Sequence, residues 1–150
     1  MSIEARQHER MVADVVDLLT NDPIAGIDAY LQLNEDRDLD GASAFLAPDA
    51  TLHWPGGVTY GGLREMVAAA AGRYRWVRKH RDDYAVGTDS GGRTVVTSRG
   101  RLYGENLHGV QFDDVRYVDV FVLDAGRIVE QHVWNDFPLT DALERTSVPS

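Results

Sequence analysis

The first third of the chain places its hydrophobic residues three or four positions apart, with charged residues between them. Over residues 3–19 this spacing predicts an amphipathic helix, which the polar segment 20–22 ends. Pro23 suits the first turn of a second helix that follows directly. A short helix is expected over residues 39–46, because Pro48 would stop it.

From residue 50 onward the chain consists mainly of runs rich in β-branched and aromatic residues, separated by glycine and aspartate turns. One helix interrupts them over residues 63–74, where a run of alanines has high helix propensity. The runs predict strands over residues 50–54, 77–86, 94–103, 115–123 and 127–136. The last four strands follow one another through a turn at residues 90–92, a loop over residues 104–109 and a tight turn at residues 124–126, which predicts an antiparallel meander. Helices followed by a meander give an α+β domain with the helices on one face of the sheet.

A length of 150 residues suits one domain with its own hydrophobic core. We expect an additional N-terminal helix over residues 1–21, the domain itself over residues 22–143, and a tail over residues 144–150. No apolar run approaches the roughly 20 residues that cross a bilayer, and no secretory leader is recognisable. The sequence therefore predicts a cytoplasmic protein that does not enter the membrane.

The composition excludes several classes of function. The net charge of −9 argues against nucleic-acid binding, which depends on lysine and arginine. One basic segment, residues 73–81, interleaves cations with aromatic residues and can be interpreted as a stacking surface or as a solvated helix end. The absence of cysteine excludes thiolate chemistry. No histidine pair has helical zinc-site spacing and no phosphate loop is present, so we expect no metal and no cofactor.

Asp119 lies in the middle of the most apolar run of the chain, residues 117–123. A carboxyl group in such a strand must find a partner or stay protonated when it is buried. Asp119 is therefore the first candidate for chemistry. Both faces of this strand are mostly apolar, so one face can cover the helices or a pocket while the other also needs cover. A homodimer through the outer face of the sheet is the simplest way to supply it.

The order of elements, together with segments 30–41, 45–51, 54–57 and 118–130, resembles the nuclear-transport-factor-2-like superfamily. This superfamily includes ketosteroid isomerases, SnoaL-like polyketide cyclases, scytalone-type dehydratases and limonene epoxide hydrolases. The resemblance implies a cystatin-like cone, in which helices fold over a curved antiparallel sheet and enclose a pocket. The same fold hosts enzymes, transport factors and inert ligand binders, so the resemblance alone does not choose an activity.

The resemblance implies a set of catalytic residues. In ketosteroid isomerases, a tyrosine and a protonated aspartic acid donate hydrogen bonds to the enolate oxygen, and Tyr30 and Asp119 occupy these positions. The position of the isomerase base holds Trp54, whose indole cannot accept a proton. Dehydratases place a histidine where this chain has His80. His80 is thus the expected base, with Asp119 either a neutral donor or the ionised partner of its ring.

Four further residues are expected to bind the substrate: Trp54, Arg99, Tyr117 and Asn135. Trp54 and Tyr117 offer flat aromatic walls to a ring-shaped, mostly apolar ligand. Arg99 lies near the arginine position of the epoxide hydrolases, although Arg101 and Val133 replace the two acids of that mechanism.

The sequence predicts a cofactor-independent acid/base enzyme that acts on a small cyclic ketone or polyketide-like substrate through an enol. Isomerisation, dehydration and cyclisation all fit this description. One alternative is a non-catalytic protein that binds a hydrophobic cyclic small molecule, which Trp54 at the base position favours. An epoxide hydrolase-like activity and a dimerisation scaffold are further alternatives, but a scaffold leaves Asp119 unexplained.

Overall fold

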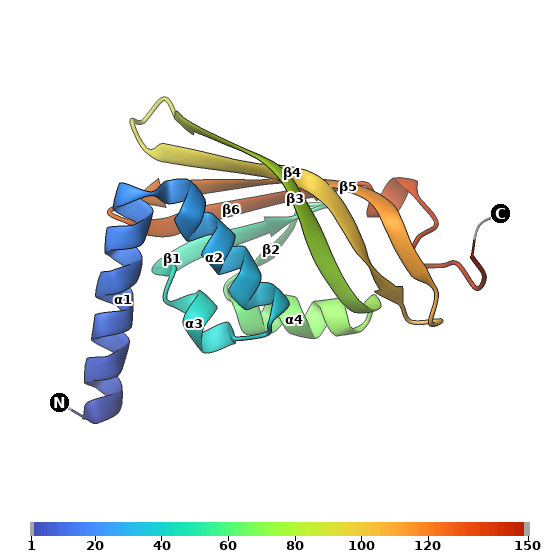
Figure 1. Ribbon diagram of the computed structural model, residues 1–150, viewed down its shortest axis with the longest axis horizontal. Coiled ribbons are helices and arrows are strands. Elements are labelled where there is room, and N and C mark those ends of the chain that lie inside the picture. The colour runs from blue at the N-terminus through green and yellow to red at the C-terminus, as the bar shows by residue number, and fades with distance from the viewer. Residues whose placement is uncertain (1, 149–150) are drawn as a thin grey trace.

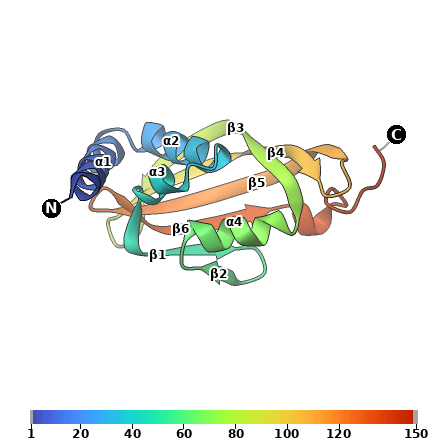
Figure 2. The same cartoon turned by 90° about the horizontal axis from the view of Figure 1, so that it is seen from below.

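In the described part of the chain, a six-stranded sheet carries four α-helices on one of its faces (Figures 1 and 2). The computed structural model describes residues 2–148. In chain order the elements are α1 (Ile3–Asn21), α2 (Pro23–Glu35), α3 (Leu39–Ser43), β1 (Leu46–Trp54), β2 (Val58–Tyr60), α4 (Leu63–Ala71), β3 (Tyr74–Thr88), β4 (Thr94–Asn106), β5 (Gln111–Asp124), β6 (Arg127–Asn135) and a final 3₁₀ turn, η1 (Phe137–Leu139). The predicted α+β class is confirmed.

The strands follow the order β2-β1-β6-β5-β4-β3. Strands β3 to β6 form the predicted antiparallel meander. Strand β1 pairs with β6 in parallel, which the sequence did not predict, and with the short β2 in antiparallel orientation. A parallel pairing requires a long connection, here the whole of the chain between β1 and β6. We call the sheet face that packs against the helices the inner face and the opposite one the outer face.

Several element boundaries differ from the sequence prediction. The helix α3 ends at Ser43, and β1 already begins at Leu46 and passes through Pro48. The pairing of β1 with β6 is irregular between Leu46 and Thr51, so the missing N–H of Pro48 breaks no regular ladder. Helix α4 ends at Ala71, and β3 begins at Tyr74, three residues earlier than the expected start at residue 77.

Helix α1 packs against the tight turn between β5 and β6. Gly126 in this turn has φ 73°, a left-handed conformation that favours glycine, and a side chain there would lie 2.8 Å from Val16 Cγ1. The same helix buries Val15 and Leu19 in the main core. The side chain of Asp22 caps the following helix by accepting a hydrogen bond from the Ala25 N–H at 3.2 Å.

Helix α2 is fixed to β3 by a row of polar side chains on one face, spaced about one helical turn apart. Asp28 accepts hydrogen bonds from Arg81 at 3.2 Å and from the Tyr84 hydroxyl at 2.7 Å. Gln32 accepts from Arg81 at 2.6 Å, and Glu35 accepts from a backbone N–H of β3 at 2.8 Å. These contacts decide which part of the inner face lies beneath α2.

The hydrophobic core has two parts. The main cluster lies between the helices and the inner face and includes Ile27, Leu31, Phe45, Leu52, Val96, Phe121 and Ile128. A smaller cluster comprises Leu102, Phe112, Val115, Tyr117 and Ala142. Members of both clusters line the inner cavity that contains Asp119. Across residues 2–148, the helices are all too short or too polar to span a membrane.

Candidate functional site

Asp119 lies at the centre of the inner face. In the sheet register it stands opposite Ser98 of β4 and Val133 of β6, so all three side chains share this face. The Asp119 side chain is fully buried. It forms part of the wall of a cavity of about 90 Å³ beneath α2 and α4, whose other lining residues include Leu31, Asn34, Glu35, Trp54, Lys79, Tyr117, Gln131 and Asn135.

The charge partner of Asp119 is Lys79, from β3. Its Nζ atom lies 3.5 Å from Asp119 Oδ2, a distance that suits an ion pair but exceeds a strong hydrogen bond. Within the described chain, neither carboxyl oxygen of Asp119 accepts a well-formed hydrogen bond. Burial raises the pKa of the Asp119 carboxyl, and the positive charge of Lys79 opposes this rise without cancelling it.

Lys79 is held between the acid and an aromatic ring. Its ammonium lies 5.2 Å from the centroid of the Tyr117 ring, within the range of a cation–π contact. Its side chain retains 23% exposure, so the ammonium keeps some contact with water. The backbone N–H of Lys79 donates to Glu35, which ties this position of β3 to α2.

The expected binding residues Trp54, Tyr117 and Asn135 all line the cavity. The Tyr117 hydroxyl lies 3.0 Å from Ser98 Oγ, and burial raises the pKa of Tyr117 to about 12, against the lowering effect of the Ser98 hydrogen bond. Trp54 is braced edge-on by Tyr60, with ring centroids 5.5 Å apart. The cavity thus has two aromatic walls beside the carboxyl group of Asp119.

Tyr30 lies behind the cavity wall rather than in it. The side chain is fully buried, and its hydroxyl donates a 2.7 Å hydrogen bond to Gln131 Oε1. Burial raises the pKa of Tyr30, and the nearby Asp119 adds to the rise. Gln131 lines the cavity and Tyr30 does not. The proton of Tyr30 is therefore committed to Gln131, so the tyrosine orients an amide instead of facing a ligand directly.

The expectation that His80 lies in the cavity is wrong. His80 is exposed and stacks on Tyr103, with ring centroids 4.1 Å apart, next to a separate hollow. Successive side chains of a strand point to opposite faces. An error of one position therefore exchanges the inward and outward residues. Lys79 faces inward and its neighbour His80 faces outward.

Arg99 is also on the outer face, contrary to the expectation that it reaches the pocket. It lies opposite Val118 in the register and pairs with Asp83 through both Nε and Nη2. The physical reason is again alternation, because Ser98 next to it points inward.

The family assignment follows from a comparison with known domains. The model of the SnoaL-like domain matches residues 27–131, which is more than half of the chain. The chain belongs to the SnoaL-like domain family. No curated protein sequence matches this SnoaL-like chain.

Solved structures share the fold of this SnoaL-like domain. TerC, crystallised together with polyporic acid, is 20% identical with a TM-score of 0.66, covering 81% of this chain and 98% of its own. A candidate polyketide cyclase from Sinorhizobium meliloti is 21% identical with a TM-score of 0.56, covering 72% and 92%. A protein with a cystatin-like fold from Xanthomonas campestris is 21% identical with a TM-score of 0.58, covering 78% and 92%. The cystatin-like cone implied by the sequence is confirmed.

Sequence reasoning missed several polar residues of this SnoaL-like cavity, among them Lys79, Asn34 and Gln131. The position of Lys79 could have been inferred from strand alternation. Lys79 lies two residues from both Val77 and Arg81, whose side chains face inward. Asn34 donates to the Tyr30 carbonyl at 2.9 Å, while its own Oδ1 is buried without a partner in the described chain. Nothing in the sequence marked Asn34 or Gln131, since their role depends on how α2 crosses the sheet.

The site combines a desolvated carboxyl, a cation and aromatic walls. Such a carboxyl binds a proton more tightly than one in water, which suits it to exchange protons with a ligand near neutral pH.

Arg37 and Arg73 also line the cavity and are exposed, so they mark its mouth and favour polar or anionic groups there. The acids of the cavity, Asp119 and Glu35, have no histidine beside them in its wall, and Glu35 is already engaged with β3 and Arg81.

Replacing the buried acid should change how stability depends on pH. Because the folded state holds the Asp119 proton more tightly than the unfolded chain, the free energy of unfolding falls as pH rises from the ordinary value of 3.8 through the raised pKa. Asp119→Asn removes this loss. We expect the variant to gain stability relative to the wild type as pH rises through this window, measured by urea unfolding at a series of pH values.

Asp83→Asn is the matched control, because hydrogen bonding to Arg99 lowers the pKa of Asp83 on the exposed outer face. The stabilisation from Asp83 is present above its ordinary pKa and is lost as pH falls through the lowered one. This control should therefore bring no gain as pH rises. If Asp119→Asn likewise gained no stability relative to the wild type as pH rises, the raised pKa of Asp119 would be contradicted.

Proposed function

We propose that this SnoaL-like protein is a cofactor-independent acid/base enzyme that acts on a small cyclic ketone or polyketide-like substrate through an enol. The observation that carries the proposal is the fully buried Asp119 carboxyl. It lies in the wall of a cavity, lacks a strong hydrogen bond within the described chain and has Lys79 as its charge partner. A carboxyl in a cavity wall that is perturbed by desolvation and has a specific charge partner is a candidate for a functional residue.

In the proposed reaction Asp119 is the base and Lys79 holds the developing charge. A carboxylate oxygen of Asp119 takes the proton from the carbon next to a ketone. The electron pair of the broken C–H bond forms the C=C bond of the enolate, and the carbonyl π electrons move onto oxygen. The Lys79 ammonium, 3.5 Å from the carboxylate, stabilises that oxygen. With a β,γ-unsaturated ketone, return of the proton to the γ carbon of the dienolate moves the double bond and gives isomerisation. With a β-hydroxy ketone, the enolate electrons form a new C=C bond as the β C–O bond breaks, and the proton passes to the departing hydroxyl group to give water.

The shape of the cavity limits the substrate. Its volume of about 90 Å³ is below the roughly 300–1,000 Å³ of common ligand pockets. A single ring between Trp54 and Tyr117 is the ligand that suits it, and side chains at the mouth, such as Arg73, must move for anything larger. Free acceptors at Asn34 Oδ1 and Asp119 favour a ligand that also carries hydroxyl groups.

The second candidate function is binding of a hydrophobic cyclic small molecule without chemistry. The co-crystal of the related TerC with polyporic acid favours it, as does Trp54 in place of the isomerase base. Epoxide opening receives less support, because Arg99 faces outward and pairs with Asp83. The test therefore has to separate enolisation from binding.

Hydrogen exchange detects enolisation whatever the final product of the reaction is. A panel of cyclic ketones, with polyporic acid as a binding probe, is incubated with the protein in D₂O. Deuterium uptake next to the carbonyl is then followed by NMR. We expect uptake by at least one ketone with the wild type, and a loss of about 10²- to 10⁴-fold in Asp119→Asn and Lys79→Met, because positioned acid/base groups contribute that much.

The control is His80→Asn, which changes the neighbour of Lys79 on the opposite face of β3 and should leave the exchange rate unchanged. Binding with no exchange for any ketone would favour the ligand-binding protein. Exchange that survives in both cavity variants would show that the site lies elsewhere.

We also propose that the protein forms a homodimer through its outer sheet face. Val118 and Trp134 are 39% and 55% exposed there, beside an open hollow of about 820 Å³. The hollow is rimmed by both charge signs, with Arg101 next to Asp82 and Arg116 next to Asp136. A surface with apolar residues and both charges is self-complementary, as a two-fold symmetric interface requires.

Sedimentation equilibrium tests the dimer. Trp134→Lys should weaken dimerisation by at least about 10-fold, because exposed tryptophans commonly dominate interface energetics. Leu139→Lys is the matched control, since Leu139 is an exposed apolar residue, 85% accessible, that does not line this hollow. A wild type that stays monomeric at all concentrations would contradict the interface.

A further inference from the structure

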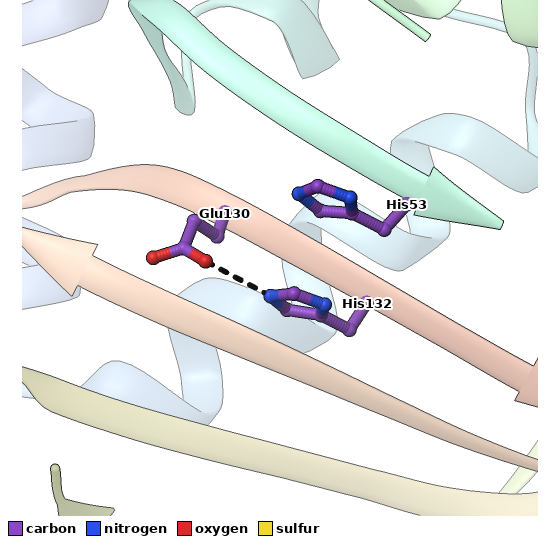
Figure 3. Close-up of side chains that lie close together, drawn as sticks. All are labelled: His53, Glu130 and His132. Carbon is purple, nitrogen blue, oxygen red and sulfur yellow. Dashed lines mark hydrogen bonds and ion pairs between the residues drawn. The ribbon is translucent and has the colours of Figure 1, made fainter. Parts of the chain in front are cut away.

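The outer face of the sheet carries a cluster of metal-ligating side chains on β1 and β6 (Figure 3). The parallel pairing of these strands sets His53 directly opposite His132. Glu130 precedes His132 by two residues and therefore shares its face. One ligand atom from each of the three residues lies within 4.8 Å of the other two. The cluster is separated from the inner cavity by the sheet, so it is independent of the proposed acid/base function.

Neighbouring groups hold the two imidazole rings in place. The rings of His53 and His132 stack with centroids 4.5 Å apart and an interplanar angle of 7°. Trp134 continues the stack beyond His132 at 5.8 Å. His132 Nε2 lies 3.0 Å from Glu130 Oε1, and His53 Nε2 lies 3.0 Å from Thr51 Oγ1. Both Nε2 atoms therefore already face polar groups.

Glu130 is oriented by a second contact. Its Oε2 lies 3.1 Å from Arg93 Nη2, while its Oε1 faces His132. Arg93 is itself held by Asp89 at 3.0 Å, so the two carboxylates together outweigh its positive charge. Glu130 thus directs one oxygen at the imidazole of His132 while an arginine holds the other oxygen, and such outer contacts orient the ligands of metal sites.

We propose that His53, Glu130 and His132 form a binding site for Zn²⁺. Two imidazole nitrogens and one carboxylate oxygen make up a common zinc ligand set, in which a fourth position stays open. Zinc–ligand distances of about 2.0–2.2 Å bring ligand atoms to roughly 3.5 Å from one another. Because the nitrogen lone pairs of the stacked rings run parallel, one imidazole has to rotate out of the stack for both rings to coordinate the same ion. The half-buried cluster borders a hollow of about 300 Å³ lined also by Trp54 and Pro55, which leaves access for the ion.

The sequence predicted no metal, because no two of its histidines are spaced to lie side by side on a helix. His53 and His132 lie far apart in the chain and meet through the parallel pairing of β1 with β6, which the sequence did not predict. Of the three residues in the cluster, Glu130 and His132 are the pair spaced two positions apart, as ligands on one face of a strand are.

Isothermal titration calorimetry of the 150-residue protein with Zn²⁺, after removal of metals with a chelator, tests the site. We expect one ion per chain in the wild type. His53→Asn, His132→Asn and Glu130→Gln should each weaken binding by at least about 10-fold, the smallest loss common for a residue that supports a metal. His80→Asn is the control, because His80 is an outer-face histidine outside the cluster, and it should bind zinc as the wild type does.

Two further measurements keep the result decisive. A zinc-soaked crystal should give an anomalous peak between the three side chains, a readout that needs no variant. Titration of Trp134→Lys separates zinc binding from dimerisation, since Trp134 borders both hollows. No binding by the folded wild type, a peak elsewhere, or equal affinity in the cluster variants would overturn the proposal.

Discussion

The burial of Asp119 is the constraint on which the rest of the site depends. A carboxyl group without water is costly unless a cation lies near it, and Lys79 supplies that cation from two strands away, across β4. Lys79 reaches Asp119 because β3 is held against α2 by Asp28, Gln32 and Glu35. The same contacts keep α2 over the cavity. One set of polar contacts thus encloses the acid and delivers its partner.

The two faces of the sheet carry different chemistry, and strand alternation separates them. The inner face presents Asp119, Lys79 and aromatic walls within a narrow space. The outer face presents ion pairs such as Arg99 with Asp83, the exposed Trp134 and the histidine cluster. Because adjacent residues of one strand lie on opposite faces, a substitution at His80 can serve as the control for one at its neighbour Lys79.

Most of the fold was predictable because its signals are local. Helical spacing identified α1 and α2, and the apolar run around Asp119 identified β5 and the buried acid. The parallel pairing of β1 with β6 was not predictable, since it depends on which sheet edge remains free after the meander forms.

The residues of the cavity were predicted less well than the fold. The start of β3 was predicted three residues too late, and His80 was chosen in place of Lys79 as the inward residue. Tyr30 was predicted to face the ligand but faces Gln131, because the way α2 crosses the sheet depends on tertiary packing.

The most direct test of this account is an NMR pH titration of the Asp119 carboxyl carbon in ¹³C-labelled protein, with Asp119→Asn used to assign the signal. We expect a midpoint above the ordinary value of 3.8, and a still higher one in Lys79→Met, because loss of the neighbouring positive charge disfavours the ionised form. A midpoint at or below 3.8, or one that Lys79→Met leaves unchanged, would contradict the claim that Asp119 is a desolvated acid tuned by Lys79.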